Sequence, residues 1–112
     1  MRPVPVVALL LGLFSRGWAA PLSEIPEPWA DRVVPIAEQR LDELEDTTAA
    51  RIRETRSRLG EMLDEPGVSA AQLAAVYGRL GALYGAHRMY AGAELGFGNA
   101  RALDPQGFQW TY

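Results

Sequence analysis

Few side chains in this sequence could support catalysis. The 112 residues include one histidine, His87, and no cysteine or lysine. A Ser/His/Asp triad would have to pair His87 with Ser57 or Ser69, and neither serine lies in the G-x-S-x-G motif that exposes a nucleophile. We interpret His87 as a surface residue in a turn, and we predict no catalytic activity in this segment.

Carboxylates and glycines are the other groups that could hold a metal or a phosphate. Four carboxylates cluster at Asp42, Glu43, Glu45 and Asp46. They lack the D-x-[DN]-x-[DN]-G pattern of a calcium loop, and they fall in a predicted helix, which cannot wrap around a cation. The glycines between positions 78 and 98 also fall within helical patterns. We therefore expect no metal site and no cofactor.

The charge of the sequence argues against nucleic acid as a partner. All 11 basic residues are arginine and 14 residues are acidic, so the net charge is −3. Loss of the first 19 residues would remove Arg2 and Arg16, leaving 9 arginines against 14 carboxylates and a charge of −5. Such a chain has little attraction for nucleic acid or anionic membranes.

Hydrophobic spacing predicts two helices that pack together in the C-terminal half. Intervals of three and four residues place the apolar and small residues of each helix on one face. These residues are Tyr77, Leu80, Gly81 and Tyr84 in the first helix and Ala93, Phe97, Ala100 and Leu103 in the second. Gly81 and Ala93 should let the two backbones approach closely, so a bulky residue at Gly81 should be poorly tolerated.

Boundary residues agree with this pattern. Ser69 and Gln72 have the spacing of a capping box, so a helix should begin near Ala70. The Asp-Glu-Pro-Gly stretch at 64–67 should end the preceding element, because proline cannot continue a helix and glycine accepts a positive φ. Pro105 should end the second helix in the same way, and the expected turn between the helices is 85–88.

These residues resemble a tetratricopeptide (TPR) repeat, whose pattern W-x2-L-G-x2-Y…A-x3-F…P spans about 34 residues. The resemblance covers residues 74–107, with tyrosine in place of the leading tryptophan. The matching positions are Tyr77, Leu80, Gly81, Tyr84, Ala93, Phe97, Ala100 and Pro105. The resemblance implies an α-solenoid unit that stacks on neighbours and binds a protein or peptide, and it implies no active site.

The resemblance also implies where a partner would bind. In TPR arrays the first helix of each repeat lines the concave face, and the positions left over from packing form a stripe there. In this sequence the stripe is Ala75, Arg79, Ala82 and Ala86. Arg79 is its only charged member, so the carboxylate clamp of some TPR domains is incomplete. Alternatively, these small side chains pack on the preceding helix.

Upstream, residues 31–65 are predicted to form one long amphipathic helix. Its apolar or small positions recur at intervals of four and three residues, which also permits a coiled-coil partner. They are Ala37, Leu41, Leu44, Thr48, Ile52, Thr55, Leu59 and Met62. We expect this helix to dock on the first repeat helix.

Charges along the same predicted helix are polarised, with the acidic cluster first and arginines after it. The arginines are Arg51, Arg53, Arg56 and Arg58. We interpret both groups as a solvated face. The alternatives are that the charges steer a charged partner, or that two copies pair antiparallel through them, so self-association is possible.

The first 19 residues have the features of a secretory signal peptide. Arg2 precedes an apolar run, and Gly17 and Ala19 are small residues at the positions that a signal peptidase inspects. We predict cleavage after Ala19 and export to the periplasm or outside the cell. The apolar run is shorter than the roughly 20 residues that span a bilayer. An uncleaved signal would be the only route to membrane attachment.

The remaining segments flank these elements. Residues 20–30 read as an extended proline-rich leader. Residues 108–112 are rich in aromatics and read as the start of a further helix or repeat. Otherwise Trp110 and Tyr112 would insert into a partner or a second copy.

Together these observations predict an all-α fold and an exported TPR interaction module, acting as a scaffold or adaptor. The alternative is the N-terminal segment of a larger exported enzyme or cofactor-binding protein, whose chemistry would lie beyond Tyr112.

Overall fold

The computed structural model describes residues 25–107, and all regular secondary structure in that range is helical. The helices are α2 (Asp46–Asp64), α3 (Ala70–Ala86) and α4 (Tyr90–Leu103). The signal peptide, the start of the leader, Trp110 and Tyr112 lie outside the described residues. No helix within 25–107 is long and apolar enough to cross a bilayer.

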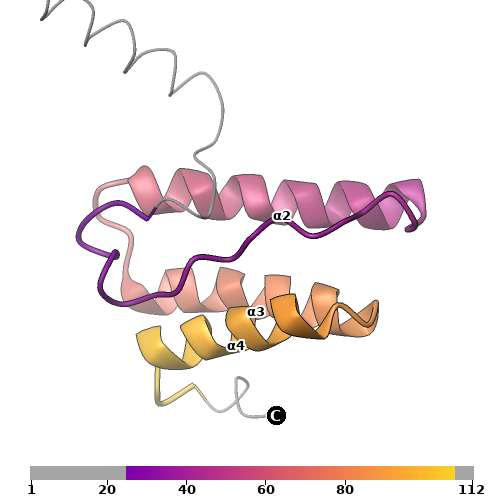
Figure 1. Cartoon of the computed structure of the whole chain (residues 1–112). Helices are drawn as coiled ribbons and strands as arrows, with labels where there is room; N and C mark the ends of the chain where they lie inside the picture. The colour runs from indigo at the N-terminus through magenta and orange to yellow at the C-terminus, as the bar shows by residue number, and fades with distance from the viewer. Residues whose placement is uncertain (1–24, 108–112) are drawn as a thin grey trace, which may run out of the picture.

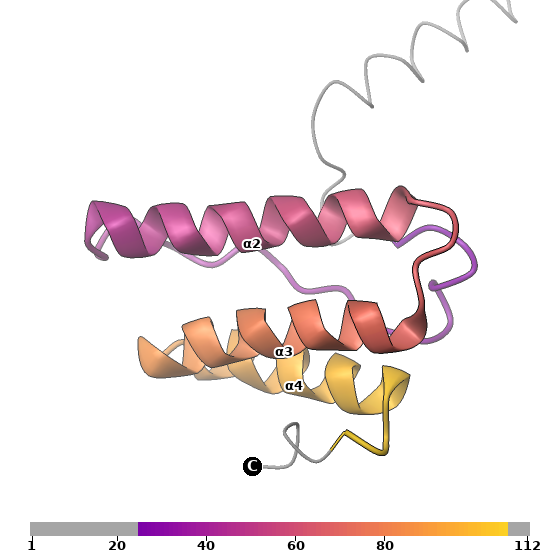
Figure 2. The same ribbon diagram turned by 180° about the vertical axis from the view of Figure 1, so that it is seen from behind.

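Helix α3 lies at the centre of the arrangement, because it packs against α2 on one side and against α4 on the other (Figures 1 and 2). Residues 25–45, which we call the strap, precede α2. They form a turn and then an extended segment that runs back along the helices (Figure 1).

The predicted helix over 31–65 is wrong for its first fifteen residues, because α2 begins only at Asp46. Pro35 has no amide hydrogen, and it disfavours helical geometry at Val34, the residue before it. In the structure both main-chain groups of Val34 bond to Asn99 on α4 instead of to a helical turn. From Asp46 onward the predicted stripe holds, since Ile52, Thr55, Leu59 and Met62 are buried and α2 packs on α3.

The start of α3 follows the predicted capping box. The Ser69 hydroxyl accepts from the Gln72 amide at 3.1 Å, and the Ser69 amide donates to the Gln72 side-chain oxygen at 2.8 Å. Helix α3 begins at Ala70, as expected. Gly67 has a φ of +86°, which is the conformation that the preceding turn needs from a glycine.

The turn between α3 and α4 is one to two residues later than predicted. Helix α3 continues to Ala86, so Gly85 belongs to its last turn. The amides of His87 and Met89 both donate to the Tyr84 carbonyl, at 3.1 and 2.8 Å, and Arg88 takes a positive φ of 64° between them. His87 is exposed in this turn, as predicted.

Helices α3 and α4 cross where glycines face each other. A Cβ at Gly81 would lie 3.1 Å from the Phe97 nitrogen and 3.2 Å from the Ala93 carbonyl oxygen, so the expected close approach is present. The tightest backbone contact is at Gly96, where a Cβ would lie 2.8 Å from the Gly81 Cα. Gly96 is not one of the positions of the repeat pattern, so the close pair Gly81–Gly96 is evident only from the structure.

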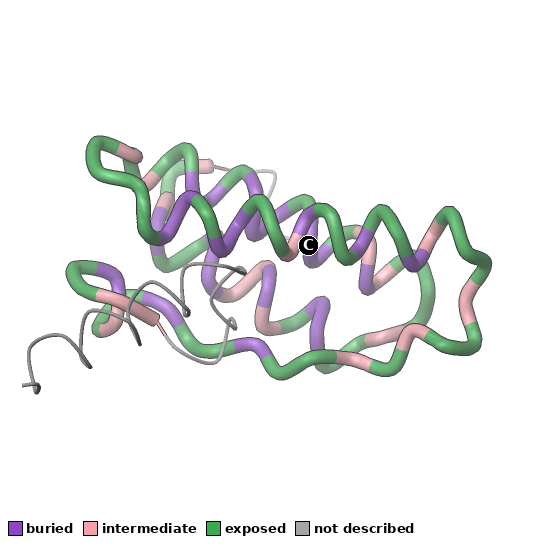
Figure 3. Tube along the Cα trace, turned by 90° about the horizontal axis from the view of Figure 1, so that it is seen from above, coloured by how far each residue is buried: buried purple, intermediate pink, exposed green. Residues whose placement is uncertain are grey.

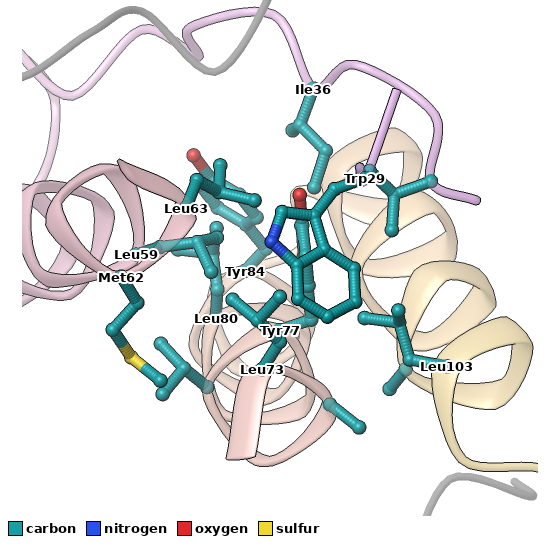
Figure 4. Packing of buried hydrophobic residues seen from close by; sticks show 14 of the residues in the cluster. Trp29, Ile36, Leu59, Met62, Leu63, Leu73, Tyr77, Leu80, Tyr84 and Leu103 are labelled. Atoms are coloured by element: carbon teal, nitrogen blue, oxygen red, sulfur yellow. The ribbon is translucent and has the colours of Figure 1, made fainter. Parts of the chain in front are cut away.

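The strap supplies part of the hydrophobic core. Trp29, Val33 and Ile36 are buried, and they alternate with exposed residues along the strap (Figure 3). The indole of Trp29 and the side chain of Ile36 point toward the helices, into the cluster that contains Tyr77 and Leu103 (Figure 4). The strap therefore covers a face of the helices that would otherwise be open to water.

Candidate protein-interaction surfaces

The stripe predicted from the sequence lies on the open face of α3. Ala75, Arg79, Ala82 and Ala86 are all exposed. Their helical positions are opposite Tyr84, which is fully buried. The alternative that these residues pack on the preceding helix is wrong, because α2 packs on another face of α3.

We call the exposed surface formed by Ala75, Arg79, Ala82 and Ala86 the outer face of α3. Three of its four side chains are methyl groups, so the main chain of a partner can come close to the helix. Arg79 forms no ion pair among residues 25–107. Its guanidinium is therefore available to donate two parallel hydrogen bonds to a carboxylate.

A second surface lies on the other side of α3, under the strap, where Asn99 holds the main chain of Val34. The Val34 amide donates to the Asn99 side-chain oxygen at 2.7 Å, and the Asn99 side-chain nitrogen donates to the Val34 carbonyl at 2.8 Å. Asn99 is only 2% exposed, whereas the Val34 side chain is 53% exposed. Asn99 therefore recognises the main chain at this position and leaves the side chain in water.

Arg56 holds the strap from the opposite side. One guanidinium nitrogen donates to the Ile36 carbonyl at 3.3 Å, and another donates to the Tyr84 hydroxyl at 3.0 Å. The interpretation of Arg56 as part of a solvated face is wrong, since it is half-buried and joins α2, α3 and the strap. Arg51, Arg53 and Arg58 are exposed, as that interpretation expected.

Three strap side chains provide the most deeply buried apolar contacts. Trp29, Val33 and Ile36 are each less than a tenth exposed. A turn orients the first of them, because the Trp29 carbonyl accepts from the amides of Arg32 and Val33 at 2.9 and 3.3 Å. The Arg32 guanidinium lies 5.5 Å from the centre of the Trp29 ring, within the range of a cation–π interaction.

We call the surface beneath the strap, which includes Arg56, Tyr77 and Asn99, the strap-binding face. This face also contains an unsatisfied hydroxyl. Tyr77 and Tyr84 are both fully buried, and Tyr84 accepts a hydrogen bond from Arg56. The Tyr77 hydroxyl has no hydrogen-bond partner among the described residues. Burial away from water raises the pKa of Tyr77 to about 12, and the nearby charge of Arg56 opposes this shift.

The polar groups considered for catalysis or metal binding lie elsewhere. The Ser69 hydroxyl caps α3, and Ser57 is exposed. Within residues 25–107, no three acidic or histidine side chains are grouped closely enough to hold a metal ion. Asp42 pairs with Arg40 at 3.1 Å on the surface, and this hydrogen bond lowers the pKa of the Asp42 carboxyl.

Sequence reasoning missed the residues that hold the strap. Asn99 has a recognisable signal, because Gly92, Gly96, Asn99 and Leu103 recur at four, three and four residues on the buried face of α4. A single amide in such a stripe indicates a specific buried partner. Arg56 likewise falls between Ile52 and Leu59 at spacings of four and three.

Comparison of the chain with protein-family models, with curated proteins and with solved structures gives no match.

Proposed function

We propose that this chain is a non-catalytic protein-interaction module built on a TPR-like helix pair. The observation that supports this proposal is the arrangement of α3. Its motif residues Tyr77, Leu80 and Tyr84 are buried, while the stripe of Ala75, Arg79, Ala82 and Ala86 is exposed along its outer face. A helix that packs through one face and exposes small side chains on the other is suited to hold a partner's backbone.

The chemistry of the outer face suggests the kind of partner. Alanine side chains allow a peptide or helix to lie close to α3, and Arg79 adds a single positive charge at the middle of the stripe. The partner segment is therefore a protein or peptide with an acidic group near its point of contact. Arg79 orients that segment, and the shape of the alanine surface provides most of the contact area.

Site-specific photo-crosslinking in the native cells tests this function. A benzophenone amino acid at Ala82 should cross-link a discrete protein, and Arg79→Ala should reduce the yield. The same group at Arg53, an exposed position on α2, is the matched control and should give no discrete product. Equal cross-linking at Ala82 and Arg53, or none at either, would contradict the proposal.

We also propose that the module acts after export. The features that support export are the apolar run of the first 19 residues and the small residues Gly17 and Ala19 before the expected cleavage site. N-terminal sequencing of the protein from its native cells should give a chain that starts at Ala20. A chain that starts at Met1 would instead favour a membrane anchor.

A further inference from the structure

The strap is held in the way that an extended peptide is held by a receptor. Asn99 and Arg56 bond to main-chain groups of Val34 and Ile36, while Trp29, Val33 and Ile36 are buried. Main-chain hydrogen bonds supply affinity that does not depend on side-chain identity, and the buried side chains supply selectivity. These contacts thus define what an extended peptide needs in order to bind here, namely main-chain groups at two positions and three apolar side chains that become buried.

The connection between these contacts and α2 is loosely held. Residues 37–45 make side-chain hydrogen bonds only among themselves in the described structure, from Gln39 to the Ala37 carbonyl and from Arg40 to Asp42. Six of these nine residues are exposed, while Leu41 and Leu44 pack partly against the core. Nine extended residues span about 30 Å, so the strap can leave while α2 stays in place.

The apolar surface beneath the strap includes polar groups that water can satisfy when the strap leaves. Arg56 and Asn99 would bond to water, as would the hydroxyl of Tyr77, which points toward the strap (Figure 4). The helices retain their own contacts, because α3 packs on α2 and α4 independently of the strap. An open state of the strap-binding face is therefore compatible with a folded helix bundle.

We propose that the strap-binding face is a second peptide-binding site, which the strap occupies in cis and which receives an extended apolar segment of a partner protein in trans. The incoming segment has an aromatic residue and two β-branched residues at the spacing of Trp29, Val33 and Ile36. It has any residue except proline at the position equivalent to Val34, because Asn99 requires an amide hydrogen there.

This site lies on the opposite side of α3 from the outer face, so it goes beyond the function proposed above. The tethered strap competes with any incoming segment, because a short tether gives it an effective concentration in the millimolar range. A partner therefore binds well only when the strap's own contacts are weakened. The strap thereby raises the affinity that a partner segment needs in order to bind.

A labelled synthetic peptide of residues 25–39 is the probe that tests this inference. Fluorescence anisotropy measures its binding to the full chain and to the variant Trp29→Ser, whose strap lacks its largest buried side chain. We expect the variant to bind the probe at least tenfold more tightly than the unchanged chain. Adding Asn99→Ala to the variant should abolish this binding.

Two altered probes test the main-chain recognition directly. A probe with Val34→Pro lacks the amide hydrogen that Asn99 accepts, so it should not bind. A probe with Val34→Thr keeps that hydrogen and changes only an exposed side chain, so it should bind as the original does. Equal binding of the proline and threonine probes would overturn the proposal.

Further controls separate the possible failures. Circular dichroism checks that Trp29→Ser remains helical, and Val33→Thr is a milder strap variant if it does not. Absence of probe binding to a helical variant would overturn the inference. Arg79→Ala should leave probe binding unchanged, so the outer-face function can fail independently. A concentration-dependent dimer that Asn99→Ala abolishes would assign the trans segment to a second copy and would also overturn the inference.

Discussion

At the scale of single residues, two tyrosines seven positions apart on α3 differ in one hydrogen bond. Both are fully buried, but Arg56 donates to the Tyr84 hydroxyl, whereas the Tyr77 hydroxyl has no partner among the described residues. A buried hydroxyl without a partner costs about 1–3 kcal/mol. The ring of Tyr77 therefore stabilises the core, while its hydroxyl opposes folding.

Replacement of each tyrosine by phenylalanine separates these contributions. Tyr77→Phe should leave the free energy of unfolding unchanged or raise it by about 1 kcal/mol, because it removes only an unsatisfied group. Tyr84→Phe should lower it by about 1–2 kcal/mol, because Arg56 loses an acceptor. Urea denaturation measures both. A loss at Tyr77→Phe as large as at Tyr84→Phe would show that the Tyr77 hydroxyl has a partner.

Tyr77 also predicts how stability depends on pH. Its pKa is about 12 in the folded chain, whereas an unfolded tyrosine titrates near 10. Between these values the unfolded chain loses its proton first, so stability is complete below pH 10 and falls as the pH rises to 12. The fall from this residue is roughly 1.4 kcal/mol per unit of pKa difference.

Urea midpoints measured from pH 9 to 12 test this dependence. The difference in stability between Tyr77→Phe and the unchanged chain should be constant below pH 10 and should then grow in favour of the phenylalanine variant. Parallel curves for the two proteins would mean that Tyr77 titrates normally in the folded state.

At the scale of elements, the packing of α3 against α4 depends on glycines at the contact. Gly81 and Gly96 face each other at the crossing, and Gly92 lies against the ring of Tyr84, where a Cβ would come within 2.6 Å of Cδ2. Close approach of the backbones lets the large residues of α3 pack on both sides of the contact. The helix pair is therefore sensitive to the addition of one methyl group at these positions.

Two glycines on α4 provide a matched pair of variants. Gly96→Ala places a Cβ 2.8 Å from the Gly81 Cα, so the helices must separate and stability should fall by about 1–3 kcal/mol. Gly98→Ala meets no atom within 4 Å and should raise stability by about 0.5–1 kcal/mol, because alanine favours the helix. Thermal denaturation compares the two. Similar effects of both variants would contradict the close packing.

At the scale of the whole molecule, the strap completes the bundle without being a helix. It covers the face of α3 that holds Tyr77 and Tyr84, and its bonds come from α2 and α4 at once (Figures 1 and 4). A segment held by a few hydrogen bonds and three side chains should open more readily than the helices beneath it.

Native-state hydrogen exchange tests this order of stability. The Val34 amide donates its hydrogen bond to the Asn99 side chain, and it should exchange with a lower opening free energy than the Leu80 amide at the middle of α3. Asn99→Ala should accelerate exchange at Val34 and leave Leu80 nearly unchanged. Equal opening free energies for Val34 and Leu80 would mean that the strap opens only on global unfolding.

The sequence alone determined the features that depend on neighbours in the chain. The Ser69–Gln72 capping box fixed the start of α3, the residues 64–67 ended α2, and Pro105 follows the end of α4. The TPR resemblance implied a partner-facing stripe of Ala75, Arg79, Ala82 and Ala86 and left open their packing on the preceding helix; the structure exposes all four. These predictions succeeded because caps, turns and helical faces involve residues within about four positions of one another.

Tertiary structure decided where α2 begins, which residues hold the strap and which glycine is closest to Gly81. The main chain at Val34 found its hydrogen bonds on Asn99, 65 positions away, instead of four residues along a helix. Hydrophobic spacing over residues 31–45 suggested a helix with Ala37, Leu41 and Leu44 on its buried face, whereas the structure has an extended segment that exposes Ala37 and buries Val33 and Ile36. Only the contact with α2, α3 and α4 selects between these two, because buried main-chain groups must be paired wherever their partners lie.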